Sequence, residues 1–232
     1  MRKVIEQWFK SLPLLALMLT ITNVTAQTAT DFQITLQNIV QTTDRTLEFD
    51  IYLLNNDLAQ PMELATFQAG ITLNSAIYSG GSLTASIVAG TSTLTNPAQV
   101  PTSITYTASA TIIKLAAKSH PGSGSGSIIS QVSPGTRIIR MKLTSTVPFA
   151  SNSTPNFFFA PSTDISPSYP TAVALYVGGL NTQLPVTMGT NAFVLENPIL
   201  NPPIAPPTAY AVTVDLGSYC QGSSGSPVGV AN

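Results

Sequence analysis

The sequence is poor in the residue types that most often perform chemistry or crosslink a chain. Its 232 residues include one cysteine, one histidine and one tryptophan, and only 8% are charged. A single cysteine excludes a framework of internal disulfides, so stability must come from a hydrophobic core. The formal net charge of −1 gives no basic surface that would attract a phosphate backbone, and nucleic acid is therefore not an expected partner.

The N-terminal segment has the three parts of a secretory signal. A basic start is followed by the apolar run of residues 12–26, with Val24 and Ala26 at the −3 and −1 positions of a cleavage site. The alternative, an uncleaved membrane anchor, would need about 20 apolar residues, and this run is shorter and interrupted by proline and threonines. We therefore predict that residues 1–26 are a signal peptide and that the mature chain, from Gln27, contains no membrane span.

Cleavage of this signal would change the composition that remains. It would remove three of the nine Lys and Arg residues and one of the ten Asp and Glu residues, which leaves a net charge near −3. It would also remove Trp8, so the mature chain would contain no tryptophan. Tryptophan has the largest flat face for stacking on a sugar ring, and its absence weakens a carbohydrate-binding interpretation.

Alternating apolar and polar residues predict strands through most of the mature chain. Within residues 31–39 and 46–54, Phe32, Ile34 and Leu36 and then Leu47, Phe49, Ile51 and Leu53 stand at every second position, which is the period of a strand with one buried face. Runs rich in Thr, Val, Ile and aromatic residues, bounded by turn residues, predict further strands. These runs are residues 65–74, 81–90, 103–117, 136–146, 156–160, 171–177 and 191–196.

The spacing of these runs indicates the fold class. No long segment repeats its apolar residues with the 3.6-residue period of a helix. About nine short strands separated by turns predict an all-β fold, an antiparallel two-sheet β-sandwich over residues 28–196. Residues 197–208 are rich in proline and predict an extended linker. Residues 209–232 resume a strand pattern and then become rich in Gly and Ser.

Catalytic groups are scarce. His120, the single histidine, stands beside the Gly/Ser run of residues 122–127, and not on a rigid scaffold as a Ser-His-Asp arrangement requires. Glu48 and Asp50 share one face of a predicted strand, and their spacing could suit the carboxyl pair of a glycosidase. The alternation places both on the solvent face, so we predict that neither is catalytic and that the protein is not an enzyme.

Metal and phosphate sites are equally weak. Asn55, Asn56, Asp57 and Glu63 offer oxygen atoms that could bind a structural Ca²⁺, but Asn and Asp in such a cluster more often bond their own backbone in a turn. The Gly/Ser run of residues 122–127 lacks the lysine and following helix of a phosphate loop. We expect a hairpin tip there, and no cofactor.

Tyrosines are the remaining candidates for ligand binding. A sugar platform could be built from tyrosine rings, and five candidates occur on or near predicted strands: Tyr52, Tyr78, Tyr106, Tyr169 and Tyr176. Of these we select Tyr106 and Tyr176 as candidate binding residues.

Three stretches resemble a known kind of module. A strand ending in "LNND" (47–57), the strand "FQAGITLN" (67–74) and the late strand "GTRIIRMKLT" (135–144) resemble the N-terminal cohesin-like sandwich of large surface proteins from bacteria that use type IX secretion. The resemblance covers about residues 30–196. It implies a β-sandwich of the fold group that includes carbohydrate-binding modules and the dockerin-binding cohesins, and it carries over no recognition residue.

The C-terminal stretch resembles a second element of such adhesins. "YAVTVDLGSYCQGSSGSPVGVAN" (210–232) is similar to the junction into an Ig-like repeat, in which a Tyr-Cys pair precedes a Gly-rich loop and a second cysteine follows later. Cys220 matches the first cysteine. The resemblance implies that residues 209–232 are the start of an incomplete repeat, and we expect Cys220 to be an unpaired thiol.

Together these features predict a non-catalytic, exported binding or adhesion module of a larger surface or secreted protein. Its partner would be a protein or a polysaccharide at the cell exterior. The alternative is a carbohydrate-binding accessory module of a polysaccharide-processing system.

Overall fold

The computed structural model describes residues 31–161 and 169–202. All of them belong to the first of two compact units, Met1–Pro202 and Pro203–Asn232. The predicted signal peptide, the Ig-like start at 209–232 and Cys220 lie outside the described residues. No helix among the described residues is both long and apolar enough to cross a membrane.

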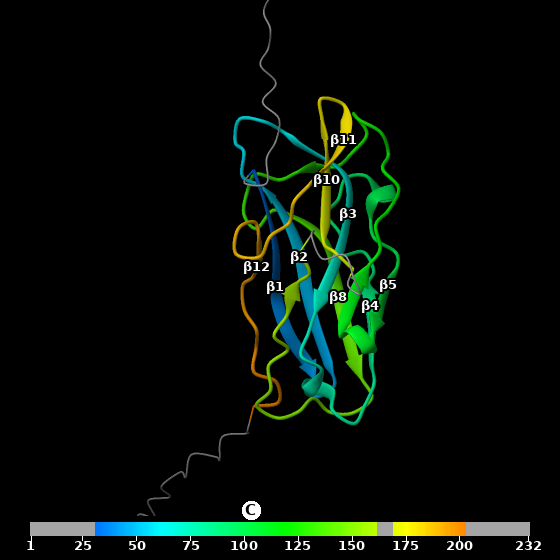
Figure 1. The fold of residues 1–232 in the computed structure, drawn as a ribbon, viewed down its shortest axis with the longest axis vertical. Coiled ribbons are helices and arrows are strands. Elements are labelled where there is room, and N and C mark those ends of the chain that lie inside the picture. The colour runs from blue at the N-terminus through cyan, green and yellow to red at the C-terminus, as the bar shows by residue number, and fades with distance from the viewer. Residues whose placement is uncertain (1–30, 162–168, 203–232) are drawn as a thin grey trace, which may run out of the picture. The chain divides into compact units, whose positions relative to one another are not determined.

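Two β-sheets enclose one hydrophobic core (Figure 1). The first has the strand order β12-β1-β2-β8-β4 and the second β11-β10-β3-β6-β5, with β7 and β9 also paired to β3. The first sheet consists of β1 (Phe32–Thr43), β2 (Thr46–Asn55), β4 (Leu83–Val88), β8 (Thr136–Ser145) and β12 (Ala192–Val194). The second consists of β3 (Met62–Thr72), β5 (Ile104–Thr107), β6 (Ile112–Leu115), β7 (Ile128–Ile129), β9 (Phe158–Phe159), β10 (Ala172–Val177) and β11 (Leu180–Leu184). The predicted two-sheet β-sandwich is confirmed.

The core is built by the alternation that the sequence shows. Phe32, Ile34 and Leu36 of β1 are fully buried, and so are Phe49 and Ile51 of β2. Successive side chains of a strand point to opposite faces, so these residues form the inner face of the first sheet. With no disulfide among the described residues, this packing against the second sheet is the main source of stability.

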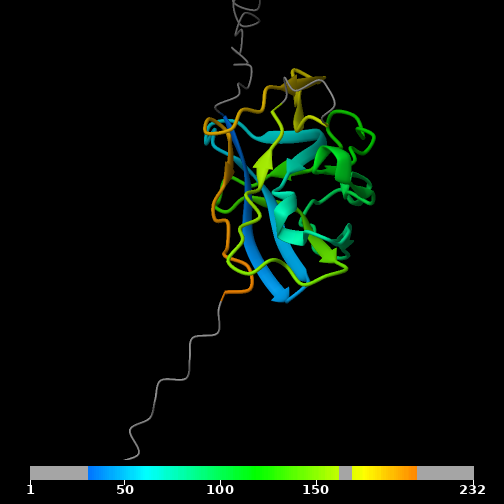
Figure 2. The same ribbon diagram turned by 60° about the horizontal axis from the view of Figure 1, so that its bottom comes forward.

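One edge of the first sheet differs from the expected antiparallel order. β12 pairs with β1 in parallel, with Ile34 opposite Ala192, and Figure 2 shows this C-terminal segment (orange) beside the blue strand. The chain reaches this edge by crossing over from β11 of the second sheet. Such a crossover, unlike a short hairpin, allows a strand to run parallel to its neighbour.

The strand prediction for residues 103–117 was wrong in one respect. This run forms two strands, β5 and β6, separated by a 3₁₀ turn at Ala108–Ala110 and by Thr111, whose φ of 49° reverses the chain. The turn contains no Gly, Pro or Asn, so no residue of the type that usually marks a turn indicated it. Two strands were also missed: β7 has only two residues, and β11 is a largely polar edge strand.

Two segments differ from what their turn and proline residues predict. The Gly/Ser run of residues 122–127 is not a free hairpin tip, because its end is buried at Ser127 and the amide of Gly126 donates to Glu63 Oε1 at 2.6 Å. The ordered fold also continues beyond residue 196. Leu200 is fully buried and forms a bridge with Ser153, since its apolar side chain covers the end of the core despite the neighbouring prolines.

Gln99 closes a gap in the ladder of β3. Along one edge, β3 pairs with β7 at its start and with β6 at its end, which leaves the carbonyls between them without a strand partner. The buried Gln99 side chain donates from Nε2 to the carbonyl oxygens of Leu64 (2.7 Å) and Ala65 (3.1 Å) and accepts from the amide of Ser127 at 2.7 Å. One amide side chain therefore replaces a missing strand.

We predict that Gln99→Met lowers the free energy of unfolding by about 3 kcal/mol, because the apolar side chain leaves buried backbone groups without partners. The measurement is urea denaturation of the variant and the parent protein. Gln183→Met is the matched control, since Gln183 is exposed on β11, and it should change stability by less than about 0.5 kcal/mol. Equal effects of the two substitutions would contradict the assignment.

Candidate functional site

The paired carboxylates of β2 lie on the outer face of the first sheet, as the alternation predicted, but they are largely covered there. Only 2% of the Asp50 side chain and 21% of the Glu48 side chain are exposed. Both are covered by arginines of β8: Arg140 Nε lies 2.8 Å from Glu48 Oε2, and its NH1 lies 3.1 Å from Asp50 Oδ2. Carboxylates held by guanidinium groups in this way form a structural ion network and are not positioned as a glycosidase pair.

Two β-bulges bring this network together. In β8 a register shift makes the consecutive residues Ile138 and Ile139 both buried, so Arg137 and Arg140, although three apart, both lie on the outer face. In β1 a second register shift surrounds Asn38, which adopts a φ of 55°. Its side-chain amide then donates to Asp50 Oδ2 at 2.9 Å. No pattern in the sequence indicated either bulge, and for that reason the network was missed.

The two oxygens of Asp50 have different surroundings. Oδ2 accepts from Asn38 and Arg140, whereas Oδ1 is buried, has no hydrogen-bond partner and lies 3.9 Å from Arg137 NH1 in a longer ion pair. Burial alone would lower the pKa of Arg140, but hydrogen bonds to Glu48 and Asp50 outweigh it and raise that pKa above its ordinary value. Arg140 therefore binds both carboxylates closely, whereas Arg137 forms only the longer ion pair with Asp50.

The other predicted groups occupy ordinary positions. His120 is exposed in the loop that precedes β7 and forms no hydrogen bond with a serine or carboxylate among the described residues. The Asn/Asp cluster forms a turn, in which Asn55 Oδ1 accepts from the amide of Asp57 (2.9 Å) and Asp57 Oδ1 accepts from that of Ala59 (2.8 Å). Glu63 bonds Gly126 instead. Among residues 31–161 and 169–202 no three His, Cys, Asp or Glu side chains gather as a metal site.

The two candidate tyrosines lie on different strands of the second sheet. Tyr106 on β5 packs edge-to-face on Tyr78, with their hydroxyl oxygens 2.5 Å apart. Tyr176 on β10 accepts from the amide of Gly122 at 2.6 Å. Because β3 and β6 separate β10 from β5, the structure does not bring the two tyrosines together, and their role in binding stays a prediction.

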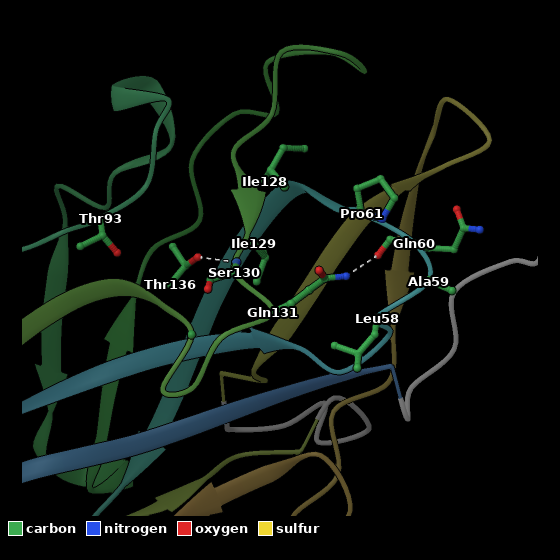
Figure 3. Close-up of a pocket in the computed structure, with 11 residues that line it drawn as sticks. Leu58, Ala59, Gln60, Pro61, Thr93, Ile128, Ile129, Ser130, Gln131 and Thr136 are labelled. Atoms are coloured by element: carbon green, nitrogen blue, oxygen red, sulfur yellow. Dashed lines mark hydrogen bonds between the residues drawn. The ribbon is translucent and has the colours of Figure 1, made fainter.

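A cleft of about 660 Å³ opens beside β7 (Figure 3). It is lined by the β2–β3 loop, by β7 with the residues that follow it, and by Thr93 and the start of β8. Hydrogen bonds fix two of its walls: Gln131 Nε2 donates to the carbonyls of Asp57 (2.7 Å) and Gln60 (3.4 Å), and Thr136 Oγ1 accepts from the amide of Ser130 (2.9 Å). Its volume lies in the range of ligand-binding pockets.

Apolar side chains are exposed around this cleft. Leu58 is 79% exposed and Ile128 is 53% exposed, and both line it; Val132, in the loop from β7 to β8, is 76% exposed. Single exposed apolar residues are common, whereas two of them lining one concave surface make it a candidate interaction site. Sequence reasoning missed this cleft because its residues come from loops and from a two-residue strand.

The backbone of β7 has an open edge toward the cleft. Leu64 donates to the carbonyl of Ser127, and Met62 lies opposite Ile129, so positions 127 and 129 face β3. Hydrogen-bonding directions alternate along an antiparallel strand. The N–H and C=O of Ile128 therefore point away from β3, where an additional extended chain could pair with them.

Comparisons with known proteins give only a general likeness. No protein-family model matches the chain, and no curated protein matches it either. Similar solved structures include the type II cohesin of a cohesin–X-dockerin complex from Acetivibrio cellulolyticus, at 13% identity and a TM-score of 0.44 over 74% of this chain and 99% of that chain. Type II cohesin A11 from Bacteroides cellulosolvens is 9% identical, with a TM-score of 0.43 over 73% and 99%. At these values the likeness assigns neither a family nor a partner.

We predict that Arg140→Met lowers the free energy of unfolding by about 3 kcal/mol, because it leaves the buried charge of Asp50 without its direct partner. Arg45→Met is the matched control, since Arg45 pairs with Asp44 at 3.7 Å on the exposed surface, and it should cost less than about 0.5 kcal/mol. Chemical denaturation of both variants measures the difference. An Arg140→Met protein as stable as the control would contradict the role of the network.

A second prediction concerns alkaline pH. Burial, followed by the hydrogen bond to Tyr78, raises the pKa of Tyr106 well above its ordinary value. The unfolded chain would therefore ionise this hydroxyl first, so stability should fall as the pH rises above about 10. Denaturation at pH 8 and at pH 10.5 should show a smaller fall for Tyr106→Phe than for the parent protein. An undiminished fall in the variant would contradict the prediction.

Proposed function

We propose that this chain is a non-catalytic binding module that acts outside the cell and recognises a partner protein through the cleft beside β7. The partner would present an extended segment with an apolar side chain. The signal-peptide pattern at the N-terminus supports export. The observation that carries the proposal is the cleft itself, with apolar side chains exposed around it and an open strand edge at Ile128.

The geometry fits strand addition. An extended segment beside β7 could exchange backbone hydrogen bonds with Ile128, and its alternate side chains would point into the cleft or away from it. The exposed side chains of Leu58 and Ile128 would then cover an apolar side chain of the segment and lose contact with water. Because Gln131 and Thr136 hold the walls by hydrogen bonds, little ordering would be needed on binding.

Glycine at position 135 supports this arrangement of the wall. Gly135 has a φ of 102°, and a Cβ there would lie 2.4 Å from the carbonyl oxygen of Leu53. Only glycine allows the loop to approach β2 this closely at that backbone conformation. The following residue, Thr136, is thereby placed at the cleft, where its hydroxyl accepts from the amide of Ser130.

We predict that a phage-displayed random dodecapeptide library, selected on the purified protein, enriches peptides with an apolar residue among β-forming neighbours. Synthetic versions should bind the parent protein, and Ile128→Lys or Leu58→Asp should weaken them at least about tenfold, as for central interface residues. Fluorescence anisotropy measures the affinities. Leu180→Lys is the matched control, since Leu180 is 72% exposed on β11 and does not line the cleft.

Two outcomes would contradict the proposal. One is that enriched peptides bind Ile128→Lys as tightly as the parent protein. The other is that no peptide is enriched while a glycan array gives binding that Tyr106→Ala or Tyr176→Ala removes, which would support the carbohydrate-binding alternative.

A further inference from the structure

Strand β11 forms one edge of the second sheet, in the β10–β11 hairpin (yellow in Figure 1). The hairpin turns through Gly178 and Gly179, with Val177 opposite Leu180, and no described strand pairs with the other side of β11. The two glycines have positive φ values of 57° and 81°, as a two-residue type I′ turn requires. The turn therefore fixes which backbone groups of β11 face β10.

Hydrogen-bonding directions alternate along β11. The pair that closes a two-residue hairpin exchanges both of its hydrogen bonds, so Leu180 bonds β10, and Thr182 and Leu184 do so by alternation. The N–H and C=O groups of Asn181 and Gln183 therefore point away from β10. The side chains of Asn181 and Gln183 are exposed, and Leu180 is 72% exposed. This edge is thus open to another extended chain.

β11 has none of the features that usually keep an edge strand from pairing. Such strands carry a lysine, a proline or a bulge, whereas the five residues of β11 are uncharged, contain no proline and pair with β10 without a register shift. The other edge strands are less suited to pairing. β12 has only three residues, and β4 and β5 lie beside one another where the two sheets meet.

The sequence of β11 is complementary to itself. Leu-Asn-Thr-Gln-Leu (180–184) has the same kinds of side chain in both directions, since Asn and Gln carry the same amide. When two copies lie antiparallel with Thr182 opposite Thr182, Asn181 of each copy lies opposite Gln183 of the other, and Leu180 lies opposite Leu184. This is also the one antiparallel register in which both outward-facing residues of each copy, Asn181 and Gln183, exchange their backbone hydrogen bonds.

We propose that β11 is a self-association edge, at which two copies of this chain pair their β11 strands about a twofold axis through Thr182. The interface is isologous, because each copy contributes the same strand. Leu180 would be covered by Leu184 of the second copy, and the threonine and amide pairs are of the kinds that stabilise neighbouring strands. One strand pair buries less than the roughly 1,200 Å² of a standard interface, so the dimer should be weak, with a Kd above about 1 μM.

Paired charge substitutions test both the self-association and its register by sedimentation velocity, at protein concentrations from about 10 μM to about 1 mM. In this register Asn181→Lys/Gln183→Lys places like charges opposite each other, whereas Asn181→Lys/Gln183→Glu places a lysine opposite a glutamate at both pairs. The first variant should dimerise at least about tenfold more weakly than the second. Non-specific repulsion gives the opposite order, because the predicted mature chain would have a net charge near −1 in the first variant and near −3 in the second.

Disulfide trapping locates the twofold axis. In a chain with Cys220→Ser, Thr182→Cys should oxidise readily to a covalent dimer, because residues of a non-hydrogen-bonded pair have Cα atoms about 4.5 Å apart, within the range of a disulfide. Gln183→Cys is the matched control. It lies on the same strand and is exposed, but it would face Asn181 of the second copy, so it should crosslink much more slowly.

Three outcomes would overturn the proposal. They are a parent protein that stays monomeric at about 1 mM, equal association of the two charge variants, and crosslinking of Gln183→Cys as fast as that of Thr182→Cys. Ile128→Lys should leave the dimer unchanged, so this edge and the cleft beside β7 are tested separately.

Discussion

The pairing of β2 with β8 is the constraint on which the rest of the structure depends. These strands lie at the centre of the first sheet, and each contributes one face to the core and one to solvent. Phe49, Ile51 and Met141 fill the core from this pair, while Asp50 and Arg140 bond each other on the opposite side. The start of β8 also lines the cleft. The core, the ion network and the cleft therefore share one strand register, and a slip of one residue would exchange the two faces.

Burying the ion network costs free energy, so its contribution lies in something other than stability. Burying Asp50 removes a carboxylate from water, and its Oδ1 receives no hydrogen bond in return. Apolar residues at these positions would pack with less penalty. Apolar side chains could, however, pack in several registers of β2 and β8, whereas Asp50 and Glu48 can both reach Arg140 in only one. We interpret the network as the element that specifies register for two strands whose inner faces are uniformly apolar.

The sequence allowed the fold class and most long strands to be predicted, because a half-buried strand repeats every two residues. β1 and β2 were predicted in this way, and β3, β8 and β10 were predicted from runs rich in β-branched and aromatic residues between turns. The same rule failed at Asp50, where the polar position of the alternation proved to be buried, because its cover comes from Arg140 on a strand about 90 residues later in the chain. It failed again for the hairpin at Thr111 and for the bulges at Asn38 and Ile138, where a single backbone conformation breaks the period. The cleft depends on loops whose positions no local pattern specifies.

The ion network and the cleft both depend on departures from regular structure. A regular β8 would point Arg137 and Arg140 to opposite faces, and the bulge at Ile138 and Ile139 returns them to the same face. A regular partner strand would run along the whole edge of β3, whereas here the short β7 pairs with its start, β6 pairs with its end, and Gln99 bonds the carbonyls between them. Bulges and interrupted edges cost stability, since each removes ladder hydrogen bonds. In a chain with a large apolar core and few charges, these are the positions at which the requirements of folding alone do not explain the sequence.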